Sequence, residues 1–165
     1  MARNFMCTKT DPVVETKAGK LRGFQLDGTY AFHGVKYADA KRFHQPTPVE
    51  PWEGIKNALA YGYVCPMLQQ DQPSNELMVP HRYWPLDENC QYLNIWTQHL
   101  DPNAKKPVLV WLHGGGFAAG SSIEHIAYEG ENMSKYGDVV VISLNHRLNR
   151  SEEHTSELQS HLMIS

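Results

Sequence analysis

Three apolar runs in the second half of the chain predict buried β-strands. They are QYLNIWTQ at residues 91–98, PVLVWLH at residues 107–113 and DVVVISLN at residues 138–145. The uninterrupted run over residues 108–112 is typical of a strand covered on both faces in a mostly parallel sheet. A helix is expected at about residues 130–136, so a right-handed parallel crossover should join the second and third strands. Strand, strand, helix and strand together indicate an α/β sheet.

The first half of the chain has a different pattern. Residues 13–34 alternate short β-prone runs with the turn signals AGK and LDGT, which predicts a small antiparallel meander. Residues 37–89 are rich in Pro, Gln, Asn and aromatic residues without sustained periodicity, so we expect ordered loop with short helical turns. Loops of this length often border a functional site.

The last sixteen residues break the pattern abruptly. Residues 150–161, RSEEHTSELQSH, resemble the translated read-through of a common DNA-sequencing adapter. We therefore interpret residues 150–165 as a non-native tail and exclude them from the prediction of the fold. On this interpretation residues 1–149 are the natural part of the chain.

Three consecutive glycines follow the strand expected at residues 108–112, in the sequence HGGGF. Parallel sheets place their functional loops at the carboxyl ends of their strands, and glycine lets a substrate approach the main-chain N–H groups closely. A phosphate-binding loop is disfavoured because neither G-x-x-x-x-G-K-[ST] nor G-x-G-x-x-G spacing is present. A purely structural turn and an oxyanion hole, in which N–H groups stabilise the charge on an ester carbonyl oxygen, both remain.

Composition excludes several classes of function. The 165 residues are 41% hydrophobic and 20% charged, with a formal net charge of −3, which is typical of a globular domain with one core. No basic stripe is present to bind nucleic acid, and no apolar stretch is long enough to span a membrane. Because no signal peptide is seen, a cytoplasmic location is expected. C-x-x-C and H-E-x-x-H are both absent, so we expect no metal and no cofactor. The oligomeric state is not predicted.

Several motifs in register resemble the type B carboxylesterase family, the branch of the α/β-hydrolase fold that includes cholinesterases and bacterial para-nitrobenzyl esterases. They are KRFHQPTPVEPWEG, ENCQYLNIW, the strand with HGGGF, and VVVISLNHRL, in the family's order and approximate spacing. The resemblance covers about residues 13–149 and implies the N-terminal part of one α/β-hydrolase domain. That part would comprise a small meander, a long loop region and the first strands of the central sheet.

The resemblance implies roles for particular residues. The family's oxyanion hole uses the N–H groups of the second and third glycines, which are Gly115 and Gly116 here, with Gly114 completing the loop. A third N–H follows the nucleophile. His113 is expected to shape the loop rather than transfer protons.

Two further residue pairs are implied by the resemblance alone. The family often closes a large loop with a disulfide between positions that correspond to Cys65 and Cys90. It also pairs the arginine of R-F with the acid of the E-D-C motif, which are Arg42 and Glu88 here. Cys7 should lie apart from the other two cysteines.

The nucleophile of such an enzyme is missing from this sequence. No serine lies in the G-x-S-x-G elbow, and the family's catalytic histidine lies far towards the carboxyl end. We therefore predict a fragment of a carboxylic ester hydrolase that is inactive alone and whose full-length form acts on a small-molecule ester. The alternatives are a catalytically inactive esterase-like adhesion domain and a short binding module. Departures from the family pattern leave the substrate open: Asn89, Gln91, His146 and Asn149 stand where Asp, Leu, Tyr and Gly are common.

Overall fold

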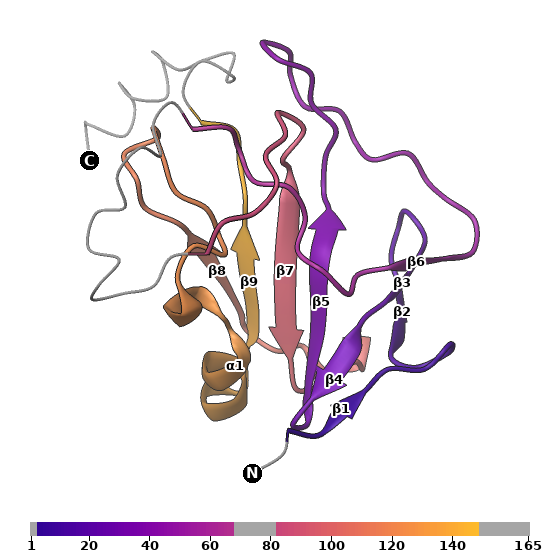
Figure 1. Cartoon of the computed structure of the whole chain (residues 1–165). Helices are drawn as coiled ribbons and strands as arrows, with labels where there is room; N and C mark the ends of the chain where they lie inside the picture. The colour runs from indigo at the N-terminus through magenta and orange to yellow at the C-terminus, as the bar shows by residue number, and fades with distance from the viewer. Residues whose placement is uncertain (1–2, 68–81, 149–165) are drawn as a thin grey trace.

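A computed structural model describes residues 3–67 and 82–148 of the chain (Figure 1). Its centre is a six-stranded sheet in the order β1-β4-β5-β7-β9-β8. The expected tail at residues 150–165 lies outside the described residues. The six strands, in spatial order, are Phe5–Met6, Phe24–Leu26, Thr29–Lys36, Tyr92–Thr97, Val140–Leu144 and Val108–Leu112.

The described part of this sheet is mixed rather than mostly parallel. β8 and β9 pair in parallel, as the crossover predicts, and every other pairing in this sheet is antiparallel. The helix of that crossover is α1, Glu131–Gly137. Both the strand–helix–strand unit and the strand that precedes it lie where the hydrophobic pattern predicted them.

The expected meander is divided between two sheets. The β4–β5 hairpin belongs to the central sheet, because β5 is eight residues long and pairs with β7. The other hairpin pairs β2, Val13–Glu15, with β3, Lys20–Arg22. β6, Ile55–Asn57, adds in parallel to β3 and completes a three-stranded sheet. Within residues 37–67 and 82–89 the structure contains no helix, so the short helical turns expected there are not found.

One face of the central sheet is covered by α1, which packs on β5, β7 and β9 (Figure 1). Its approach is close because the N-cap residue is Gly130: a Cβ there would lie 2.6 Å from Val141 Cγ1 and 2.7 Å from Trp96 Cε3. Ala31, Trp96 and Val141 form the buried cluster beneath the helix. Two short 3₁₀ turns, η1 at Pro102–Ala104 and η2 at Ile126–Tyr128, stand in the connections on either side of β8.

β8 is an edge strand, which corrects the expectation that both of its faces are covered. All five of its residues are exposed, from 37% at Leu109 to 63% at Leu112. The physical reason is that β9 pairs with one edge of β8, no described strand lies on the other edge, and α1 packs on β5, β7 and β9 rather than on β8. The residues of β8 are as apolar as those of a central strand, although β8 lies at the edge of the described sheet.

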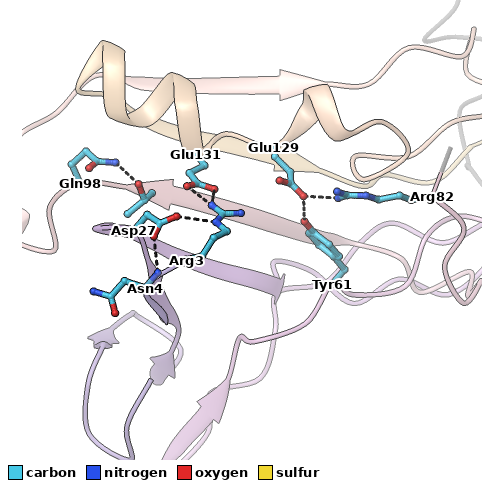
Figure 2. A network of polar contacts seen from close by, with 9 residues as sticks. Arg3, Asn4, Asp27, Tyr61, Arg82, Gln98, Glu129 and Glu131 are labelled. Carbon is cyan, nitrogen blue, oxygen red and sulfur yellow. Dashed lines mark hydrogen bonds and ion pairs between the residues drawn. The ribbon is translucent and has the colours of Figure 1, made fainter. Parts of the chain in front are cut away.

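The long loop region is held to the sheet by polar contacts at the start of α1. Glu129 Oε1 accepts hydrogen bonds from Arg82 Nη1 at 2.5 Å and from Tyr61 Oη at 3.2 Å (Figure 2). Arg3 lies beside them and donates to both Glu131 and Asp27. Residues distant in sequence are therefore fixed on the same side of the sheet as α1.

Candidate active site

The glycine loop, residues 113–122, leaves β8 in a conformation that only glycine adopts easily. Gly115, Gly116 and Gly120 have φ values of 121°, 63° and 98°. Gly115 is the most constrained, because a Cβ there would lie 1.9 Å from the carbonyl oxygen of Ala119. Gly114 does not have a positive φ, and a Cβ there would meet no atom within 4 Å, so its role in the loop is less demanding. Phe117 also has a positive φ, of 60°.

The turn of the glycine loop is closed by hydrogen bonds to one carbonyl oxygen, that of Gly115. Gly115 O accepts hydrogen bonds from Ala118 N at 3.1 Å and from Ala119 N at 3.2 Å. The N–H groups of Gly115 and Gly116 lie beyond the end of the β8 ladder at Leu112, and neither donates a hydrogen bond within residues 3–67 and 82–148. Both residues are exposed. Two adjacent main-chain donors are thus presented outside strand pairing, with no acceptor among the described residues.

Below the loop lies a buried polar network that sequence reasoning missed. Asn145 Oδ1 accepts from Ser122 N at 2.8 Å, and Asn145 Nδ2 donates to Tyr63 O at 3.0 Å. Asn94 Nδ2 lies 3.3 Å from both Ser122 Oγ and Ser143 Oγ. Polar residues interrupt or end the apolar runs of β7 and β9, and that interruption was the available signal.

His113 lies at the start of the loop, and among the described residues it makes no contact suited to proton transfer. Its Nδ1 lies 2.8 Å from Gly114 O, so Nδ1 must carry the proton and donate it. The ring stacks on His146 with centroids 4.7 Å apart and an interplanar angle of 6°. Burial lowers the pKa of His113, and the neighbouring His146 adds to that effect. A neutral imidazole is therefore favoured at the start of the glycine loop.

Cys65 and Cys90 are brought together with Leu148 in one buried cluster, and no disulfide joins them. A hydrogen bond with Cys65, together with burial, raises the pKa of the Cys90 thiol. Cys7 is separate: its Sγ lies 3.4 Å from Gly23 O. The structure thus places the implied pair in one buried cluster, without a disulfide between them.

Arg42 and Glu88 form the ion pair that the resemblance implied, with Arg42 Nε 3.1 Å from Glu88 Oε1. The two side chains are 54% and 39% exposed, so the contact is a surface one worth about 1 kcal/mol or less. A buried arginine instead holds this loop: Arg147 Nη1 donates to His44 O at 2.7 Å and to Lys41 O at 3.2 Å. Sequence reasoning missed Arg147, although an arginine beside the apolar end of a predicted strand was a signal.

The described residues offer no site for a metal ion: nowhere in them do three or more His, Cys, Asp or Glu side chains gather suitably. Across the same residues, none of the helices is both long and apolar enough to cross a membrane. The candidate site therefore consists of main-chain donors and the buried groups beneath them.

Comparison with known proteins adds to this geometry. Residues 10–150 match the model of the carboxylesterase family. Among curated relatives, para-nitrobenzyl esterase of Bacillus subtilis (strain 168) is 36% identical over 144 residues, covering 84% of this chain and 28% of its own length. Phenmedipham hydrolase of Pseudarthrobacter oxydans is 40% identical over 144 residues, with the same coverage of 84% and 28%.

Among solved structures, an esterase from anaerobic Clostridium hathewayi that can hydrolyze aliphatic aromatic polyesters is 64% identical, with a TM-score of 0.85. The match covers 90% of this chain and 29% of that one. A para-nitrobenzyl esterase structure is 36% identical with a TM-score of 0.70, and the match covers 84% of this chain and 28% of that one. The chain thus spans about 28% of the length of the curated relatives it matches.

Proposed function

Since the chain belongs to the carboxylesterase family, with the fold of an α/β hydrolase, we propose that its glycine loop supplies two donors of the oxyanion hole of a serine carboxylesterase. Gly115 and Gly116 are the donors. The observation that carries this proposal is that both N–H groups lie outside the β8 ladder and donate no hydrogen bond within the described residues.

In the proposed reaction, a serine hydroxyl attacks the ester carbonyl carbon and the carbonyl oxygen becomes negatively charged. A histidine takes the serine proton and later gives it to the leaving alcohol. The two N–H groups donate hydrogen bonds to the oxygen as its charge develops, so they favour the transition state over the ground state. Water then attacks the acyl-enzyme and releases the carboxylic acid.

The nucleophile and its base would come from the part of the longer relatives that this chain does not match. No G-x-S-x-G occurs in the 165 residues. We therefore propose that the chain alone is inactive, because two donors without an attacking group have no reaction to accelerate.

We propose small carboxylic esters with an aromatic group as the substrate class. The related proteins act, by their names, on para-nitrobenzyl esters, on phenmedipham and on aliphatic aromatic polyesters. The 64% identity to the Clostridium hathewayi esterase makes aromatic esters the first compounds to test.

A chimera tests the proposal. Residues 10–148 replace the matching segment of the Clostridium hathewayi esterase, and hydrolysis of para-nitrophenyl acetate and para-nitrobenzyl acetate is followed. We expect saturable turnover by the chimera and none by the 165-residue chain or by the acceptor lacking that segment. A folded chimera without turnover would contradict the proposal and favour an esterase-like binding domain instead.

A further inference from the structure

Two consecutive residues at the carboxyl end of β9 contact the two ends of the glycine loop, and we propose that Asn145 and His146 are positioning residues for its N–H donors. The inference rests on the proposed function, because it concerns how Gly115 and Gly116 are held where that reaction needs them. We call the pair of contacts, Asn145 with Ser122 and His146 with His113, the β9 clamp.

The first half of the β9 clamp is a set of hydrogen bonds that use every polar group of Asn145. Its Oδ1 accepts from Ser122 N and its Nδ2 donates to Tyr63 O. Its main-chain N donates to Tyr92 O at 2.8 Å, and its main-chain O accepts from Tyr37 Oη at 2.9 Å. Asn145 is 3% exposed and Ser122 is 1% exposed, so the bond between them is shielded from water. The end of the loop is therefore fixed to β9.

The second half is a ring stack at the start of the loop. The His146 and His113 imidazoles are nearly parallel, with an interplanar angle of 6° and centroids 4.7 Å apart. Each ring is also held locally, since His113 Nδ1 donates to Gly114 O and His146 Nδ1 donates to Arg147 O at 2.9 Å. His113 is 9% exposed. The residue immediately before the three glycines therefore lies against the end of β9 through His146.

Between these two buried ends the loop lies at the surface of the described structure. Residues 114–118 are exposed, and the turn around Gly115 O is closed by the loop itself. Further contacts lie near the loop's end: Gly120 N donates to Met67 Sδ at 3.0 Å, Ser121 N donates to Glu124 Oε2 at 3.4 Å, and Asn94 Nδ2 lies 3.3 Å from Ser122 Oγ. The positions of the two donors therefore depend on where His113 and Ser122 are held. A displacement of about 1 Å in a catalytic group can cost on the order of 100-fold in rate.

Four variants of the chimera separate positioning from general stability. Asn145→Ala removes the acceptor for Ser122 N, and His146→Ala removes the ring. His146→Tyr keeps a planar ring that can stack on His113. Val141→Ala is the matched control on the same strand, because Val141 packs with Ala31 and Trp96 under α1.

We expect kcat to fall about 10- to 100-fold in Asn145→Ala and His146→Ala, with KM changed less than about threefold. Affinity for a trifluoromethyl ketone, which mimics the tetrahedral intermediate, should fall in parallel with kcat. His146→Tyr should recover most of the lost kcat. Val141→Ala should lower Tm but leave the ratio of ketone affinity to KM unchanged.

Hydrogen exchange tests the β9 clamp independently of turnover. Amides of residues 113–122 should exchange faster in Asn145→Ala than in Val141→Ala at equal global stability. Equal exchange in both variants, or kcat and ketone affinity no lower in Asn145→Ala than in Val141→Ala, would overturn the inference. A folded chimera without turnover would overturn the proposed function, while the exchange comparison would still decide whether the clamp exists.

Discussion

Gly115→Ala is the substitution that most directly tests the glycine loop. A Cβ at residue 115 would lie 1.9 Å from the carbonyl oxygen of Ala119 and 2.6 Å from its carbonyl carbon. Both atoms belong to the backbone, so no side-chain rotation can relieve the clash. The φ of 121° is also strained for any residue with a Cβ. The substitution keeps the N–H group and changes only where the loop can place it.

The expected decrease in kcat follows from the interactions that the glycine loop loses in Gly115→Ala. Relieving the clash separates Gly115 O from Ala118 N and Ala119 N, two hydrogen bonds that contribute about 1 kcal/mol each. Keeping the observed conformation instead retains the clash and costs 1 to 3 kcal/mol or so for the φ of 121° alone. By either route the loop loses about 2 kcal/mol or more. At about 1.4 kcal/mol per tenfold, kcat should fall at least about 30-fold, approaching the loss of one oxyanion donor, which costs about 100-fold or more.

The assay measures kcat and KM of the chimera with para-nitrophenyl acetate, alongside thermal unfolding. Gly54→Ala is the matched control, because Gly54 also has a positive φ, 76°, but no atom lies within 4 Å of its Cβ position. It should lose a little stability and no kcat. Gly115→Ala with kcat within about threefold of the parent would refute the assignment of the loop as an oxyanion hole.

Three further predictions concern stability and reactivity. The 165-residue chain alone should self-associate through the exposed β8 edge. Val110→Lys, at the centre of that edge, should reduce the association measured by light scattering. A monomeric parent chain would contradict this prediction. In a folded chimera that carries residues 3–148 instead of 10–148, iodoacetamide should label Cys7 at least about tenfold faster than Cys90, whose thiol pKa is raised. Equal labelling of the two cysteines, measured by mass spectrometry, would show that Cys90 is accessible. Burial lowers the pKa of His33 to about 4, so the unfolded chain binds this proton first as pH falls. The contribution of neutral His33 to the free energy of unfolding is complete above about pH 6.5. It decreases by at most about 3 kcal/mol as the pH falls towards 4. The decrease in Tm over this pH range should therefore be smaller in His33→Phe than in the parent.

The candidate site could be predicted from the sequence only where a local motif carries it. Gly115 and Gly116 follow an apolar run closely, and the need for backbone without Cβ is local, so HGGGF indicated the loop before any fold was known. Asn145 and Ser122 could not be paired in this way. They are 23 residues apart and meet only because β9 returns beside β8, so their hydrogen bond depends on strand order.

The same division holds for the cysteines and for the ion pair. The family resemblance implied that Cys65 would lie near Cys90 and Arg42 near Glu88, and both pairs lie together in the structure. Whether a contact is buried or exposed was not contained in the resemblance. The Arg42–Glu88 pair is on the surface, while Arg147 is buried and holds the same loop.

The sequence by itself determined the β7, β8, α1 and β9 elements and the parallel pairing of β8 with β9. The reason is that hydrophobic periodicity and chain connectivity are local properties, and a strand–helix–strand unit has one strongly preferred handedness. Only the tertiary structure decided that β5 joins the central sheet, that the described sheet is mixed and that β8 lies at its edge. Strand order depends on contacts between distant segments, and an apolar strand reads the same in a sequence whether its second neighbour is present or absent.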